Sequence, residues 1–217
     1  MFDILSLYSR PYDPLMPVVC FDEKLVELRQ SVRKGYRTRN GIRVCDYEYQ
    51  KNGTANLFVM TEPKGGNHYV RTTERRTKKD FARSLKWLAS RYTKAITIHL
   101  VMDNLNTHKE SSLIELYGKK EGRRLWARFT VHYTPVHASW LNQAEITIGA
   151  ITKATLQERI ANMETLRKKT LAFAAVLRKK KWPINWGFTI ERAKKWISRV
   201  ENQRLKTSRS EYWCCDW

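Results

Sequence analysis

The chain has 217 residues, of which 42% are hydrophobic and 12% aromatic, so it is long enough to bury one sizeable core and differs from a disordered chain. It contains no apolar run near the roughly 20 residues that span a bilayer, and no signal peptide at its start. Lys and Arg total 41 against 21 Asp and Glu, and this net charge of +20 favours nucleic acid over an anionic membrane as the partner. We therefore expect a cytoplasmic, nucleoid-associated protein.

The first half of the chain is typical of antiparallel strands, because β-rich runs alternate with Pro- and Gly-rich turns. These strands are expected at residues 17–21, 55–60 and 68–73. The last two flank the turn 62–66, which contains two glycines and predicts a hairpin. Residues 25–29 could extend the first strand or pair with it, and the basic segment 31–43 is typical of a loop or a hairpin tip.

From Thr77 onward the apolar residues recur at spacings of three and four, which indicates helices between the remaining strands. Further strands are expected at residues 95–102 and 129–133, and helices at residues 77–91, 109–117, 139–157, 163–180 and 189–199. This order predicts an α/β fold with one mixed five-stranded sheet, helices on its faces and extra carboxy-terminal helices. Residues 1–160 are expected to form the main domain, with residues 161–217 as a basic helical extension packed on it.

Two aspartates are expected where strands end. In AITIHLVMDNLNTH, eight mostly apolar residues lead into Asp103, and the first predicted strand likewise ends at Asp22. Asp103 could cap a turn or helix, because Asp side chains bond to nearby N–H groups. It could also bind a metal or act in catalysis, because open α/β sheets place ligands at the carboxyl ends of strands. If the two strands are neighbours, a divalent cation such as Mg²⁺ would relieve the repulsion between their carboxylates.

A third acid, Glu145, belongs to the helix expected at residues 139–157. It lies at the edge of an inward-facing stripe, where an acid would ordinarily be costly to bury. The stripe consists of Leu141, Ala144, Ile148, Ile151 and Thr155. Glu145 could extend to solvent or pair with a lysine. Together with Asp22 and Asp103, it instead favours a metal site with three carboxylates.

Five segments of the chain resemble, in the same order, bacterial insertion-sequence transposases of the mariner superfamily: VVCFDEK, NGTANLFV, TERRTKKDF, LVMDNLNTH and HYTPVHASWLNQAEI. The resemblance covers roughly residues 8–160 and implies a DDE endonuclease domain with a ribonuclease H-like fold. It assigns the two aspartates and the glutamate of that family to Asp22, Asp103 and Glu145. It also implies two Mg²⁺ (or Mn²⁺) ions held by these acids, which cut DNA at the ends of the element and join it to target DNA by two-metal phosphoryl transfer.

Four polar residues flank the acids in these segments, namely Asn104, His108, His137 and Asn142. Each could orient a metal ligand or contact a phosphate, and each could equally close a turn. Glu23 should point away from Asp22 in a strand, either to the surface or to support the site. Trp140 could stack on an unpaired base or belong to the core.

Two basic runs, residues 71–79 and 178–181, could be solvated surface or could follow DNA backbones, and the large excess of charge favours phosphate contact. The resemblance implies transposon ends and target DNA as partners, with a homodimer as a possible assembly. Transposases of this kind normally carry helix-turn-helix modules before the catalytic domain, whereas 21 residues precede Asp22. We therefore expect a separately encoded helix-turn-helix module, or else a truncated copy.

The tail TSRSEYWCCDW does not resemble the family and could come from a frameshift. Its Cys214 and Cys215, like Cys20 and Cys45, have no spacing that suits zinc, and the latter two are expected to be core thiols. The alternative function is a catalytically inactive transposase remnant that binds nucleic acid without sequence preference. A structural RNA-binding protein would also explain the charge, but it would leave the three acids as coincidences.

Overall fold

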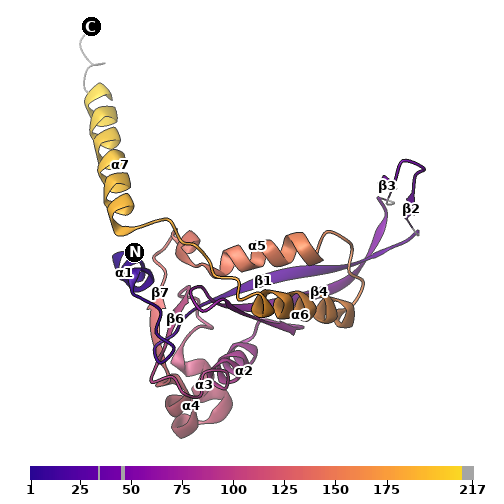
Figure 1. Ribbon diagram of the computed structural model, residues 1–217, viewed down its shortest axis with the longest axis horizontal. Coiled ribbons are helices and arrows are strands. Elements are labelled where there is room, and N and C mark those ends of the chain that lie inside the picture. The colour runs from indigo at the N-terminus through magenta and orange to yellow at the C-terminus, as the bar shows by residue number, and fades with distance from the viewer. Residues whose placement is uncertain (34, 45–46, 212–217) are drawn as a thin grey trace.

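The computed structural model describes residues 1–33, 35–44 and 47–211, and its centre is a five-stranded sheet in the order β5-β4-β1-β6-β7 (Figure 1). The strands are β1 (Val18–Ser31), β4 (Tyr49–Glu62), β5 (Asn67–Thr73), β6 (Ile98–Met102) and β7 (Phe129–Tyr133). Strand β4 is antiparallel to both β1 and β5, whereas β6 is parallel to both β1 and β7. The predicted mixed sheet of five strands is thus confirmed.

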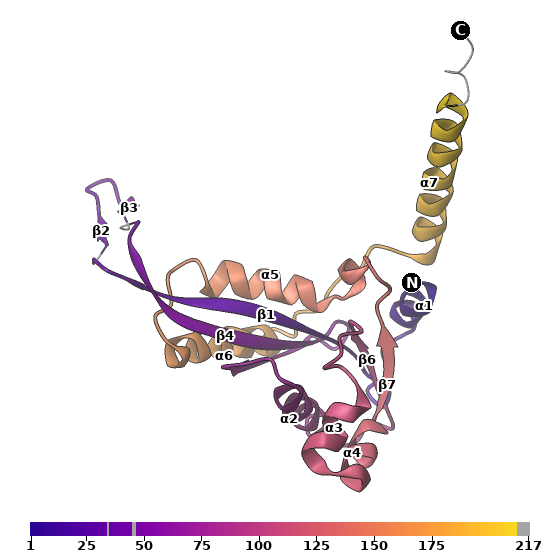
Figure 2. The same cartoon turned by 180° about the vertical axis from the view of Figure 1, so that it is seen from behind.

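Strand β1 is much longer than the sequence predicted, and Asp22 lies within it rather than at its end. The strand continues because Val26 and Leu28 are buried in the same hydrophobic cluster as Ile151 and Leu166, which belong to the helical segments after residue 143. The interpretation that residues 25–29 extend the strand is therefore confirmed. Beyond the sheet, β1 and β4 form a long two-stranded arm. The arm carries the short strands β2 (Tyr36–Arg37) and β3 (Arg43–Val44), so the segment 31–43 does form a hairpin tip (Figure 2).

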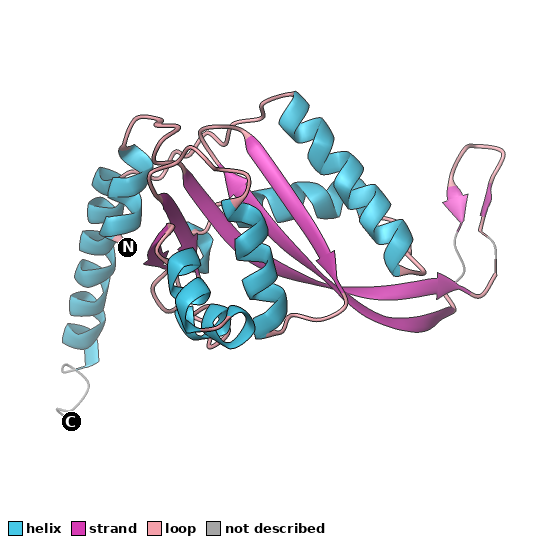
Figure 3. Ribbon diagram, turned by 90° about the horizontal axis from the view of Figure 1, so that it is seen from below, coloured by secondary structure: helices cyan, strands magenta, loops and turns pink. Residues whose placement is uncertain are grey.

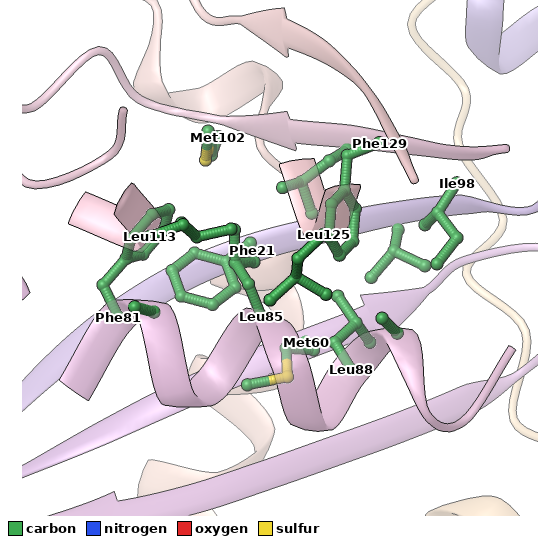
Figure 4. Close-up of a cluster of buried hydrophobic side chains, with 14 of the residues drawn as sticks. Phe21, Met60, Phe81, Leu85, Leu88, Ile98, Met102, Leu113, Leu125 and Phe129 are labelled. Carbon is green, nitrogen blue, oxygen red and sulfur yellow. The ribbon is translucent and has the colours of Figure 1, made fainter. Parts of the chain in front are cut away.

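Three helices cover one face of the sheet: α2 (Lys78–Ala89), α3 (Glu110–Tyr117) and α4 (Lys119–Trp126). Figure 4 shows the core beneath them, where Phe21, Met60 and Leu85 are among the labelled side chains. Thr77 begins α2 with a reciprocal capping box, as its sequence predicted. Helix α4 was not predicted, because its sequence KKEGRRLW has little apolar character. It forms because Gly122 lets it approach α3 closely: a Cβ there would lie 2.7 Å from the Ile114 Cα atom.

The opposite face carries α1 (Phe2–Ser9), which the sequence did not predict, together with α5 (Ala144–Thr155) and α6 (Met163–Lys179) (Figure 3). The helix expected from residue 139 begins at Ala144 instead, and Ser139–Leu141 forms a short 3-10 helix, η1. The break has a local cause: the Asn142 amide oxygen accepts a hydrogen bond from the Ala144 N–H at 3.2 Å. Of the predicted stripe, Ile148 is half-buried and the other members are buried.

The last helix, α7 (Ile190–Glu211), projects from the body of the protein (Figure 1). It is longer than the sequence predicted, and no glycine or proline interrupts these residues. Cys20 is a buried core thiol, whereas the predictions for Cys45, Cys214 and Cys215 lie outside the described residues. Within the described part of the chain, none of the helices has the length and apolar character needed to span a membrane. The domain boundary at residue 160 stays a prediction.

Candidate functional site

The two candidate aspartates come from neighbouring parallel strands. Strand β1 pairs with β6 so that Cys20 lies opposite Val101. Continuing this register by two residues brings Asp22 beside Asp103, which directly follows the last residue of β6. The two strands are therefore neighbours, which is the condition under which the carboxylates were expected to lie side by side, and both acids belong to the same region of the sheet.

Glu145 lies in the first turn of α5, which packs on the same face of the sheet as the buried side chain of Cys20. Its side chain is exposed. The neighbouring stripe is buried as predicted except for the half-buried Ile148, so Glu145 at its edge fits the alternative in which the side chain extends to solvent. The Glu145 carboxylate therefore keeps its contact with solvent and is accessible to a ligand.

The environment of Asp22 favours its protonated form. Burial is the main cause, and the charges of Glu145, Asp103 and Glu23 act in the same direction, so that its pKa is raised to about 6. The N–H of Glu23 opposes this shift by donating a hydrogen bond to the Asp22 Oδ1 atom at 2.7 Å. Negative charge thus accumulates around Asp22 without an equal positive charge next to it.

His108 connects two of the acids. Its Nδ1 atom lies 2.5 Å from the Asp103 Oδ1 atom, and its Nε2 atom lies 3.1 Å from the Glu23 Oε1 atom. The imidazole is buried and stacks on the Phe81 ring at a centroid distance of 4.6 Å. Burial lowers the pKa of His108, but the hydrogen bonds to Asp103 and Glu23 outweigh it and raise the pKa to about 9. An imidazolium therefore holds one oxygen of Asp103 in place.

Glu23 points away from Asp22, as predicted, but it is not a surface residue. Its side chain is 7% exposed, and besides His108 it meets the Arg76 guanidinium at 4.0 Å. The alternation of side chains along a strand indicated that Glu23 points to the opposite face from Asp22. It could not identify His108 as the partner of Glu23, because the two residues are 85 positions apart in the sequence.

The other flanking residues differ in their surroundings. Asn142 is buried, and its Nδ2 atom donates to the Phe21 carbonyl at 2.8 Å, which ties the start of α5 to the residue before Asp22. Asn104 and His137 are exposed, and His137 adopts a left-handed backbone conformation with a φ of 61°. Trp140 packs edge-on against Phe188 but is 40% exposed, so it is not a buried core residue, and its stacking on a base stays a prediction.

The chemistry of the donors fits a hard divalent cation, since Asp22, Asp103 and Glu145 provide carboxylate oxygens in a region of excess negative charge. Their present arrangement is open: among the described residues, no three His, Cys, Asp or Glu side chains are placed to hold a metal ion together. Repulsion between carboxylates accounts for this, and the contact with His108 engages one oxygen of Asp103. Convergence of the three acids on one ion stays a prediction.

The fold belongs to the ribonuclease H-like class and is similar to two solved structures. The Mos1 mariner paired-end complex with Mn matches with a TM-score of 0.50 and 17% identity, covering 83% of this chain and 54% of that chain. The Mos1 transposase paired-end complex with left transposon end matches with a TM-score of 0.51 and 14% identity, covering 82% and 57%. The chain thus spans little more than half the length of these structures.

The family itself is defined by sequence. The model of the DDE superfamily endonuclease family matches residues 17–167, and the chain belongs to this family. A search of curated proteins found no match. The DDE endonuclease domain and the ribonuclease H-like fold that the resemblance implied are therefore confirmed, whereas a mariner-type transposase of bacterial source stays a prediction.

Proposed function

We propose that this chain is the catalytic domain of a transposase, which cuts DNA strands and transfers them to a target with the help of bound divalent ions. The observation that carries the proposal is the accumulation of carboxylate charge around Asp22, to which Asp103 and Glu145 contribute. It occurs in a chain of the DDE superfamily endonuclease family, at the carboxyl end of a parallel strand pair.

In this proposal Asp22, Asp103 and Glu145 hold two Mg²⁺ or Mn²⁺ ions. Such ions, when bound, activate the attacking oxygen and stabilise the leaving oxygen of a phosphoryl transfer. His108 fixes one oxygen of Asp103 and leaves the other available, so it acts as a positioning residue. Asn142 fixes the start of α5, and exposure of Glu145 allows its carboxylate to turn towards Asp22.

DNA is the proposed substrate. The net charge of +20 favours contact with phosphates, and the similar structures are Mos1 paired-end complexes, one of them with a left transposon end. The proposed phosphate contacts are the basic runs 71–79 and 178–181, together with the exposed Asn104 and His137. We further propose that a separately encoded helix-turn-helix module supplies sequence recognition, that the protein acts as a homodimer, and that it works on the DNA of the nucleoid.

The alternative is a catalytically inactive remnant that binds nucleic acid without sequence preference. One observation favours it: the described residues contain no ready group of three metal ligands. The two proposals differ in whether the acids are needed for chemistry, because binding through phosphate contacts requires none of them.

The test replaces Asp103 with Asn in a protein supplied with its helix-turn-helix module and active on end-bound DNA. Asn is itself a good helix and turn cap, so Asp103→Asn preserves a capping role and removes the charge that would hold a metal. We expect Mg²⁺-dependent cleavage to fall about a thousandfold or more, with DNA affinity retained. Glu164→Gln, which removes a negative charge from an exposed position in α6, is the matched control and should keep full activity. Full cleavage by Asp103→Asn would overturn the catalytic assignment.

A further inference from the structure

A cavity of about 420 Å³ lies at the opposite end of β1 and β6 from the candidate site. Val18 and His99, at the beginnings of these strands, line it, together with Tyr8 and Trp186 from outside the sheet. Asp22 follows Val18 by four positions in β1, which corresponds to about 13 Å along the strand. The volume lies within the range of pockets that hold small molecules.

Two buried side chains that line this cavity have oxygen atoms without a partner. Glu62 and Gln143 are each 1% exposed, and the Oε1 atom of each has no hydrogen bond among the described residues. The other carboxylate oxygen of Glu62, Oε2, accepts two hydrogen bonds, one from the Asn67 amide and one from the Tyr92 hydroxyl at 3.0 Å. The half-exposed Tyr12 also interacts with the Glu62 carboxylate at the cavity. Burial is the main cause that raises the pKa of Tyr12, and the charge of Glu62 and a side-chain hydrogen bond with it act in the same direction, while Oε1 itself has no hydrogen-bond partner among the described residues.

The chain is shaped to place the Glu62 carboxylate there. After the strand ends, the turn brings Gly65 against the side chain, and a Cβ atom at Gly65 would lie 2.5 Å from the Glu62 Cδ atom. Only the missing side chain of this glycine makes room for the carboxyl group. The turn thus leaves space for the buried carboxyl group next to Gly65.

The carboxylate has no cationic partner of its own. None of the ion pairs between described residues includes Glu62. The nearby Lys64 ammonium group donates to the Arg10 carbonyl instead. Burying an ionised carboxylate is costly unless a charged or hydrogen-bonding group compensates it. The free oxygens of Glu62 and Gln143 are both acceptors, so a group that serves them must be a donor, and a positive charge would match the carboxylate best. The Trp186 Nε1–H also lines the cavity without a partner among the described residues, and it could donate to a lone pair of the ligand or to a water beside it.

We propose that this cavity binds a small organic cation, in which an amidinium, guanidinium or primary ammonium group pairs with Glu62 and an apolar stem packs against the aromatic wall. Tyr8 and Trp186 form that wall, with their rings edge-on at a centroid distance of 5.7 Å. Aromatic faces also attract cations. Residues 7–16 and 184–186 contribute much of the lining and lie outside the segment that matches the family.

The experiment is calorimetric titration of the full chain, free of DNA, with benzamidine and with its neutral analogue benzamide. The net charge of +20 disfavours non-specific binding of a cation elsewhere on the surface. We expect one saturable site and about tenfold or greater preference for benzamidine, because charge-assisted hydrogen bonds are stronger than neutral ones. Glu62→Gln keeps the shape and removes the charge, and should bring the two affinities to within about twofold of one another. Glu164→Gln, an exposed acid in α6, is the matched control and should behave as the wild type.

A second variant, Gln143→Met, keeps the volume, removes the other free acceptor, and should weaken benzamidine binding severalfold. It provides the test if Glu62→Gln does not fold. Two outcomes overturn the proposal: absence of saturable binding to the wild type at millimolar benzamidine, or equal affinity for the charged and neutral ligands. Both would mean that water fills the cavity and satisfies the free oxygens.

Discussion

The two ends of the central sheet both bury acidic side chains, but they compensate the charges differently. At the end that carries Asp22 and Asp103, one imidazole bridges two carboxylates, and the remaining negative charge helps burial to raise the pKa of Asp22 to about 6. At the cavity end, neutral donors hold one oxygen of Glu62 and leave the other without a partner among the described residues. Each end thus retains charge that its own side chains do not neutralise, which is a common property of ligand sites.

The largest effect on stability is expected from removing the bridge at the first end. His108→Ala leaves the 7%-exposed Glu23 side chain without its buried partner, and breaking a buried pair typically costs about 3–5 kcal/mol. We expect a loss of about 3 kcal/mol in the free energy of unfolding, measured by urea denaturation in EDTA. In a Glu23→Ala background the same substitution should cost much less, because no buried charge remains to be stranded.

The control for this prediction is His137→Asn, at an exposed histidine whose φ of 61° suits asparagine. It should change the stability by no more than about 0.5 kcal/mol. An equal loss for His108→Ala with and without Glu23 would show that the imidazole matters through its packing on Phe81 and not through the bridge.

A smaller effect of opposite sign is expected at Asp22. Its carboxylate is repelled by its neighbours, so Asp22→Asn should stabilise the metal-free protein at pH 7.5 by about 1–2 kcal/mol. Because the pKa of Asp22 is raised, the cost is present above pH 6 and should vanish below about pH 4, where the carboxyl group is protonated in both folded and unfolded chains. Denaturation in EDTA at the two pH values measures it. A destabilising Asp22→Asn at pH 7.5 would show that the charges are already compensated.

Much of the fold could be predicted from local patterns. Strand β7 was predicted with its observed bounds, because a short β-rich run stops at the Thr134-Pro135 turn. Asp103 was placed correctly after a strand, since the apolar run stops abruptly there. The length of β1 could not be read in the same way, because Lys24 and Glu27 interrupt its apolar pattern and only the packing of Val26 and Leu28 extends the strand.

The candidate site was only partly accessible to sequence reasoning. The sequence located Asp22 and Asp103 on two separate strands, and the strand order of the sheet, in which β1 pairs with β6, brings them into one region. The contact between Glu23 and His108 joins residues 85 positions apart, and no local signal specifies it. The cavity depends on the loop near Trp186 closing over residues at the start of β1, so it too is a purely tertiary feature.

The smallest effect is expected near the cavity end, at the buried His68, where it should appear as a pH dependence. Its Nε2 atom lies 2.7 Å from the Trp182 carbonyl and must carry the proton, while its Nδ1 atom lies 3.1 Å from the Thr147 hydroxyl and accepts from it. The Thr147 hydroxyl in turn accepts from Thr61, so its own hydrogen is directed to the imidazole. This arrangement requires neutral His68, and burial lowers its pKa, with the charge of Arg178 acting in the same direction.

Because the pKa of folded His68 is lower than that of the unfolded chain, its contribution is complete above about pH 6.5 and is lost as the pH falls below that value. His68→Gln can still donate to the Trp182 carbonyl through its amide and cannot be protonated. We expect the difference in unfolding free energy between wild type and His68→Gln to shrink from pH 8 to pH 5, when both are measured by urea denaturation. A difference that stays constant over this range would show that His68 accepts a proton in the folded state, and that the cavity end tolerates positive charge beside Arg178.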